Sequence, residues 1–206
     1  MYARSTTFDT PHAALDVGIG RVRDQLMPAV LDVEACVGLS LLVDPASGRC
    51  VLTTAWRSKE AMQDAADRLR PVSDRLADVL DGPADDEEWE IAVLHRDHPS
   101  GPGTCVRTVR MQVEPDRLAH SVDLYRMVLL PQIEEFDGFC SVGLMVDRAC
   151  GHAVSSVAFD SREAMRQTRN LAAVVREGAT HEASGEILDV AEFDLALAHL
   201  HVPDLV

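Results

Sequence analysis

The chain has 206 residues, of which 47% are apolar and 26% charged, a composition typical of a folded protein with a substantial core. Its formal net charge of -15 argues against nucleic-acid binding, because that binding depends on clustered lysine and arginine that neutralise phosphates. No stretch approaches the roughly 20 apolar residues that span a bilayer, so we expect a cytoplasmic protein with neither nucleic acid nor membrane as a partner.

The first half of the chain predicts the order strand, helix, strand, strand, helix, strand. Residues 3–9 form the first expected strand, and apolar side chains at helical spacing then predict a helix: Leu15, Ile19, Val22, Leu26 and Val30. The apolar runs 37–43 and 51–56 predict two strands joined by a hairpin that ends in Gly48. A second helix is expected from Ser58, with Pro71 kinking or ending it, and 88–95 reads as the last strand.

The second half repeats the first. A shift of 103 residues aligns the chain on itself from Ala3 to about Ala66, and a shift of 104 then places 88–95 on 192–199. The second helix of this copy is expected to start at Ser161, where Asp160 and Glu163 also have the spacing of a capping box, and Gly178 is expected to end it. Turn-forming residues mark the junction, so we expect a first repeat at 1–98, a linker at 99–103 and a second repeat at 104–206.

The central strands are apolar on both parities, as in 39–43 and 142–146, so both faces of each sheet must be covered. Helices of the same repeat cover one face, and the sheet of the sister repeat is the simplest cover for the other. The predicted fold class is α+β: two ferredoxin-like βαββαβ repeats whose antiparallel sheets pack face to face as a dimeric α+β barrel within one chain.

Several segments carry a family resemblance. The Pro-containing helix ends around Pro28 and Pro131, the run Asp137-Gly138-Phe139 and the strand-to-helix segment 54–62 together resemble the antibiotic-biosynthesis monooxygenase-like superfamily of dimeric α+β barrels. The resemblance covers nearly the whole chain, twice. It implies a tandem copy of a fold that usually pairs two identical chains, and activities such as cofactor-independent oxygenation of aromatic or quinol-like substrates and oxidative haem breakdown.

Two side chains of the second repeat are the candidate catalytic residues, Tyr125 and His120. They lie five residues apart on one predicted helix, about 140° out of register, so only one of them can face a shared pocket. Tyr125 occupies the apolar stripe and is therefore the better cavity group of the two, although a core tyrosine whose hydroxyl has a hydrogen-bond partner is the simpler explanation. The first repeat has valine at both positions.

Arg107, Arg4 and Trp56 are the candidate substrate-binding residues. The two arginines recur in the first strand of each repeat, where a positive charge could hold an oxyanion or could instead reach solvent. Trp56 could stack on a flat substrate, whereas an aromatic side chain at a strand end is also typical of the core.

The residues favour neither a bound cofactor nor a metal. In the haem-degrading branch of the superfamily, the resemblance implies an Asn in the first strand and a Trp and a His in the second helix. The nearest match to that His in this chain is His181, which lies just past the predicted end of the helix. His199 and His201 share a strand face without a completing ligand, and the five cysteines read as buried free thiols.

The leading interpretation is therefore a small-molecule-binding barrel that acts as a cofactor-independent monooxygenase on an aromatic or quinol-like substrate. A non-catalytic ligand-binding or scaffold protein is the alternative, and a haem-binding or haem-degrading protein is the lesser one. The chain is expected to be a monomer with a pseudo-dimeric core or a homo-oligomer.

Overall fold

The computed structural model describes residues 1–80, 85–173 and 185–200, and for residues 72–80 and 200 it describes the backbone alone. Two βαββαβ sets follow one another. The first comprises β1 (Tyr2–Asp9), α1 (His12–Arg21), η1 (Val22–Leu26), α2 (Met27–Leu31), β2 (Cys36–Val43), β3 (Arg49–Trp56), α3 (Lys59–Leu80) and β4 (Asp85–Arg96). The second comprises β5 (Cys105–Gln112), α4 (Leu118–Leu124), η2 (Tyr125–Leu129), α5 (Leu130–Glu134), β6 (Phe139–Asp147), β7 (His152–Phe159), α6 (Arg162–Gln167) and β8 (Glu186–Leu200).

The strands follow the hydrogen-bonded order β1-β3-β2-β8-β5-β7-β6-β4, which closes on itself as an antiparallel barrel. Two of the strands, β4 and β8, are longer than the others. One half of each belongs to the first compact unit and the other half to the second. The predicted fold class, a duplicated ferredoxin-like unit that forms a dimeric α+β barrel within one chain, is confirmed.

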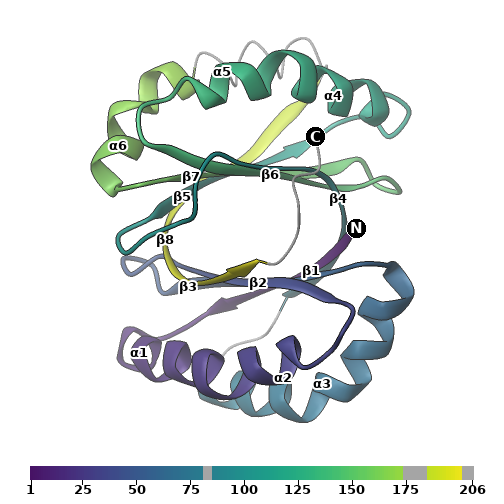
Figure 1. The fold of residues 1–206 in the computed structure, drawn as a ribbon, viewed down its shortest axis with the longest axis vertical. Helices are drawn as coiled ribbons and strands as arrows, with labels where there is room; N and C mark the ends of the chain where they lie inside the picture. The colour runs from purple at the N-terminus through teal and green to yellow at the C-terminus, as the bar shows by residue number, and fades with distance from the viewer. Residues whose placement is uncertain (81–84, 174–184, 201–206) are drawn as a thin grey trace. The chain divides into compact units, whose positions relative to one another are not determined.

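The first compact unit comprises Met1–Trp89 together with the second half of β8. Its helices α1, α2 and α3 cover one face of the sheet that contains β1, β3 and β2 (Figure 1). The expected helical stripe packs against this sheet, since Val22, Leu26 and Val30 are at most 2% exposed. Burying an aliphatic side chain of this size contributes about 1.5–3 kcal/mol, so the stripe fixes the helix on the sheet.

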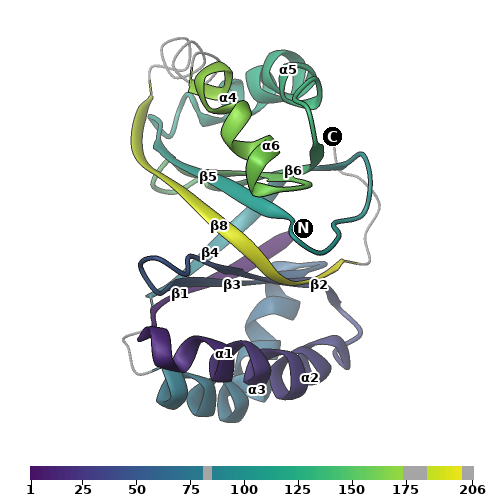
Figure 2. The same ribbon diagram turned by 90° about the vertical axis from the view of Figure 1, so that its left-hand side faces the viewer.

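The second compact unit comprises Glu90–Phe193 and repeats this arrangement. Helices α4, α5 and α6 cover one face of the sheet that contains β5, β7 and β6 (Figure 2). Leu118, Val122, Tyr125 and Ile133 form the buried stripe, as the repeat predicts.

The compact units do not follow the division expected from the sequence. They divide the chain within β4, after Trp89, and within β8, after Phe193, so each unit borrows a half-strand from the other repeat. The boundaries 1–98, 99–103 and 104–206 describe the repeats of the sequence and stay a prediction.

The predicted hairpins have the conformation that glycine allows. Gly48 and Gly151 have φ values of 82° and 79°, and an added Cβ would overlap a backbone carbonyl at either position. Pro71 does not end its helix, because α3 runs on to Leu80. Gly178 lies outside the described residues.

The second helix of repeat two is capped by Ser161, whose hydroxyl accepts a hydrogen bond from the backbone N–H of Ala164. The expected capping box beginning at Asp160 is therefore wrong, and the side chain of Asp160 has other partners. The five cysteines are free, as predicted, although Cys150 is exposed. Among the described residues, no helix combines the length and the apolar composition needed to cross a membrane.

Candidate active site

The second unit contains a partly open cavity of about 70 Å³ between its sheet and its helices. The lining is apolar except for three polar side chains, Arg107 on β5, Tyr125 on η2 and Ser155 on β7. The other lining residues are Val109, Met111, Leu129, Ile133, Phe136, Val157, Phe159 and Ala172. A second cavity of about 40 Å³ adjoins it and shares the side chains of Met111, Tyr125 and Leu129. An apolar pocket with a few convergent polar groups is typical of a ligand site.

Tyr125 is placed in this cavity by the apolar stripe of its helix. It begins the short π-helical segment η2, a distortion that often marks functional positions. Its hydroxyl lies 2.6 Å from the hydroxyl of Ser155, and the side chain is buried. Burial raises the pKa of the Tyr125 hydroxyl well above its usual value, although the bond to Ser155 acts in the opposite direction. Tyr125 therefore stays protonated at neutral pH and can donate a hydrogen bond.

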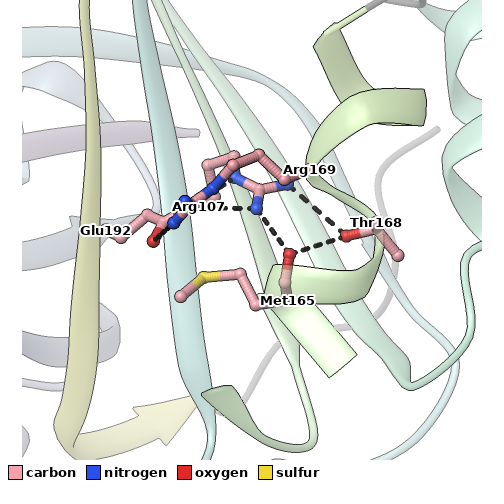
Figure 3. Close-up of polar contacts among 5 residues, drawn as sticks. All are labelled: Arg107, Met165, Thr168, Arg169 and Glu192. Atoms are coloured by element: carbon pink, nitrogen blue, oxygen red, sulfur yellow. Dashed lines mark hydrogen bonds and ion pairs between the residues drawn. The ribbon is translucent and has the colours of Figure 1, made fainter. Parts of the chain in front are cut away.

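Arg107 is the buried cation of the cavity, with 4% of its surface exposed. Its guanidinium donates to the backbone carbonyl of Met165 at 2.5 Å and, more weakly, to the hydroxyl of Thr168 at 3.5 Å (Figure 3). It also lies 5.6 Å from the centre of the Phe159 ring, close enough for a cation–π interaction. These contacts hold the charged group between strand β5 and helix α6.

Glu192 on β8 joins two arginines. One of its carboxylate oxygens accepts from Arg107 at 3.0 Å, and the other accepts from Arg169 at 2.7 Å (Figure 3). Burial alone would raise the pKa of the Glu192 carboxyl, but the hydrogen bonds from Arg169 and Arg107 outweigh it and hold that pKa below its usual value. Two guanidinium groups on one carboxylate give the cluster a net charge of +1, which favours an anionic ligand.

Three of the corresponding positions of the first repeat carry apolar side chains, two of them larger than their counterparts. Leu52 stands where the second repeat has Ser155, and Trp56 stands where it has Phe159. Both side chains belong to the hydrophobic core of the first unit, and so does Val22, the counterpart of Tyr125. The indole N–H of Trp56 donates a hydrogen bond to the hydroxyl of Thr54 at 3.1 Å. Trp56 is therefore a core residue whose single polar group has a partner within the protein.

The other predicted residues lie away from this cavity. Arg4 belongs to the first unit, where its side chain is 25% exposed and pairs with Glu88 at 2.7 Å. His120 is exposed on α4 and lines neither of the two cavities. Of the sequence candidates, Tyr125 and Arg107 line the larger cavity together. His181 and His201 lie outside the described residues.

Sequence reasoning missed two members of the site, Ser155 and Glu192. The replacement of Leu52 by Ser155 between repeats is a change from a large apolar to a small polar residue within a strand. Glu192 repeats Glu88, and each follows an arginine of the same repeat by about 85 positions. Comparing the repeats position by position would have indicated both residues.

No protein-family model matches the chain. Two curated relatives are uncharacterized proteins of Mycobacterium tuberculosis. Rv2558 is 51% identical to the protein over 100% of this chain and 88% of its own length, and Rv2557 is 48% identical over 100% of this chain and 92% of its own length.

Solved structures share the fold at low sequence identity. A putative monooxygenase of Fusobacterium nucleatum has a TM-score of 0.73 at 10% identity, covering 98% of this chain and 96% of that chain. An anthrone oxidase-like protein has a TM-score of 0.69 at 14% identity, covering 97% and 93%. A ferredoxin-fold protein of Listeria monocytogenes related to antibiotic biosynthesis monooxygenases has a TM-score of 0.55 at 12% identity, covering 95% and 94%.

A haem-degrading enzyme of Listeria monocytogenes has a TM-score of 0.53 at 12% identity, covering 94% of this chain and 99% of that chain. At these identities the likeness shows the fold alone, which these solved structures share with the chain. By its sequence, the chain belongs to the family of the Mycobacterium tuberculosis proteins Rv2558 and Rv2557.

Proposed function

We propose that the second unit binds an aromatic phenol or quinol in its cavity and oxidises it with O₂, without a bound cofactor. The observation that carries the proposal is the combination of an apolar cavity, a buried Tyr125–Ser155 pair and a net positive cluster around Arg107. The names of the F. nucleatum and anthrone oxidase-like neighbours agree with this reaction class, although their likeness concerns the fold alone.

The cavity volumes favour a single aromatic ring. A cavity of about 150 Å³ accommodates benzene in a protein core. The two adjoining cavities, of about 70 and 40 Å³, together fall somewhat short of that volume, and Met111 lines both of them. Methionine is unbranched and flexible, so rotation of Met111 would join the two spaces at little cost.

The polar groups suit a substrate that reacts as its anion. A positive cluster favours the phenolate over the phenol, and the proton is released to solvent. The phenolate then supplies an electron to O₂, and recombination forms a C–O bond. Overall, the substrate loses two hydrogen atoms, one from the reacting ring carbon and one from a hydroxyl group, and gains one oxygen atom. The second oxygen atom of O₂ leaves as water, and the substrate supplies all four electrons.

In this reaction Tyr125 acts as a hydrogen-bond donor, because burial keeps its hydroxyl protonated and so unsuited to act as a base. Arg107 supplies positive charge beside the developing oxyanion. Its hydrogen bonds use four of its five N–H groups, which leaves one N–H on Nη1 without a partner among the described residues. A donor already held in place stabilises charge at low reorganisation cost.

A non-catalytic ligand-binding protein is the second candidate. It is favoured by the engagement of most Arg107 donors with the protein itself, which resembles a structural clamp between β5, β8 and α6. A haem-binding role has less support, since the described part of the second helix in each repeat carries neither Trp nor His.

Oxygen uptake separates these functions. The full chain is incubated with substituted single-ring phenols and hydroquinones, and O₂ consumption and quinone absorbance are recorded together. The proposal predicts one O₂ consumed per molecule oxidised, with turnover reduced about 10- to 100-fold in Tyr125→Phe and unchanged in Arg148→Lys, a variant of an exposed arginine.

Binding of these compounds without O₂ consumption would instead support the non-catalytic function. A shifted Soret band on titration with haemin would support the haem-binding one. Equal turnover in the wild type and Tyr125→Phe would remove Tyr125 from the mechanism.

A further inference from the structure

Three potential metal ligands meet at one end of the second unit's sheet, near the start of β6 and the end of β7. His98 follows β4, Cys140 lies at the start of β6, and Asp160 follows β7. One ligand atom from each, the Nε2 of His98, the Sγ of Cys140 and a carboxylate oxygen of Asp160, lies within 4.8 Å of the other two. None of the three residues lines the cavity described above.

The backbone holds these residues in place. The ladder between β6 and β7 is irregular between Phe139 and Ser141, so Cys140 occupies a bulge, a feature that redirects a side chain. The N–H of Asp160 donates to the carbonyl of Gly138 at 2.8 Å, and the N–H of Asp97 donates to the carbonyl of Cys140 at 2.9 Å. Hydrogen bonds of the sheet therefore position all three ligand-bearing segments.

The histidine is oriented as a ligand would be. The Nδ1 of His98 lies 2.8 Å from a carboxylate oxygen of Asp97, which directs Nε2 towards Asp160 and Cys140. A carboxylate bonded to the far nitrogen of a ligating histidine is the common outer-shell arrangement at zinc sites, where it fixes the ring and strengthens the ligand.

Two of the distances between the ligand atoms are slightly shorter than the edges of a tetrahedral zinc site. Zinc bond lengths of about 2.0–2.3 Å place neighbouring ligand atoms roughly 3.3–3.6 Å apart. Asp160 Oδ1 lies 2.9 Å from His98 Nε2 and 3.2 Å from Cys140 Sγ, so shifts of a few tenths of an ångström would admit an ion at these two edges. Cys140 is buried while Asp160 is exposed, so the cluster lies at the surface of the second unit, where solvent reaches one of its ligands.

We propose that His98, Cys140 and Asp160 bind one zinc-class transition-metal ion, with Asp97 as the positioning residue for His98. One thiolate, one imidazole and one carboxylate form a borderline-soft ligand set that suits Zn²⁺ better than Mg²⁺ or Ca²⁺. The first repeat has Val37 and Arg57 at the positions of Cys140 and Asp160, so it offers neither ligand. The site is thus a property of the second repeat.

The alternative explanation of this cluster is a hydrogen-bond network that stabilises the fold without a metal ion, in which Asp160 accepts from both His98 and Cys140. The two differ in their response to a metal ion. The untagged full chain, stripped with a chelator, is titrated with Zn²⁺ in competition with a chromophoric chelator, and separately with Co²⁺ followed by absorbance. The proposal predicts one Zn²⁺ per chain and a cobalt–thiolate charge-transfer band.

Variants assign the ligands. His98→Gln and Asp160→Asn change exposed or half-exposed side chains and so preserve the fold, which far-ultraviolet circular dichroism checks; both should abolish stoichiometric binding. Asp97→Asn should weaken it about 10- to 100-fold. Cys150→Ser is the matched control, because Cys150 also contacts a carboxylate, that of Asp147 at 3.0 Å, with no histidine in the contact.

Three results would overturn the proposal. The wild-type chain could fail to bind stoichiometric Zn²⁺, the affinity could be unchanged in both His98→Gln and Asp160→Asn, or the cobalt–thiolate band could disappear in Cys150→Ser and persist in Cys140→Ser. Retention of binding in Cys150→Ser together with its loss in Asp160→Asn would support the proposal.

Discussion

Replacing Arg107 by methionine tests whether the buried cluster stabilises the second unit. Methionine keeps an unbranched apolar side chain and removes the charge, so the decrease in the free energy of unfolding measures what the ion pair and the hydrogen bonds contribute. Breaking a buried pair costs about 3–5 kcal/mol. Because Glu192 is 22% exposed and keeps its bond to Arg169, we expect about 2–4 kcal/mol for Arg107→Met.

Arg4→Met in the first unit is the matched control. The side chains of Arg4 and Glu88 are 25% and 36% exposed, and exposed pairs contribute about 0–1 kcal/mol. Urea unfolding followed by far-ultraviolet circular dichroism measures both losses, and tryptophan fluorescence reports the first unit, where Trp56 and Trp89 lie. Equal losses in the two variants would refute the assignment of Arg107 as a buried structural charge.

The remaining predictions concern the same elements. A double-mutant cycle of Tyr125→Phe and Ser155→Ala, measured by urea unfolding, should give a coupling energy of about 1 kcal/mol, and additivity would contradict the buried hydrogen bond. Folding lowers the pKa of Glu192, so this carboxylate stabilises the folded state at pH values above its unfolded pKa of about 4.3, and the stabilisation is lost as the pH falls through the folded pKa. Glu192→Gln should therefore make the free energy of unfolding depend less steeply on pH in the acid range. An unchanged slope would show that other carboxyl groups set it. Gly151→Ala should lower the free energy of unfolding by more than about 1 kcal/mol, because a Cβ there would overlap the Val113 carbonyl. Gly20→Ala in α1, where a Cβ meets open space, should raise it by about 0.5–1 kcal/mol in thermal unfolding. The reverse order of stability would refute the argument from the space around each glycine.

The fold was predictable from the sequence because the duplication supplied each element twice. The period of Leu118, Val122 and Tyr125 predicted the same buried stripe as its counterpart in the first repeat, and both stripes are buried. The hairpin glycines were predictable for a local reason, because a short loop that joins two apolar runs and ends in glycine needs the positive φ that the structure shows. Local pattern and global fold agree at these positions.

The exchange of half-strands was not predictable. The segments 88–95 and 192–199 were correctly predicted as strands. The residues of a strand do not determine which neighbouring strand its second half pairs with. In the structure β4 continues from Trp89 along β6, and β8 continues from Phe193 along β2. The compact units therefore differ from the sequence repeats.

The candidate site was predictable in part. The helical period separates Tyr125 from His120 by about 140°, and the cavity receives Tyr125 while His120 faces solvent. The partners of Arg107 were not predictable from spacing, because Glu192 lies 85 positions away. Asp160 was misread as a cap for the same reason, since its partner His98 lies 62 positions away in a segment that reads as a linker.

The central claim is that the cavity of the second repeat is the working site, and Ser155→Leu tests it most directly. The fold tolerates leucine at the equivalent register, where Leu52 pairs with Leu41 in the first repeat, so the substitution fills the cavity and leaves the strand pairing intact. Calorimetric titration with a substituted hydroquinone should show binding to the wild type and to the conservative variant Leu52→Met, and no binding to Ser155→Leu. Equal affinity for wild type and Ser155→Leu would contradict the account.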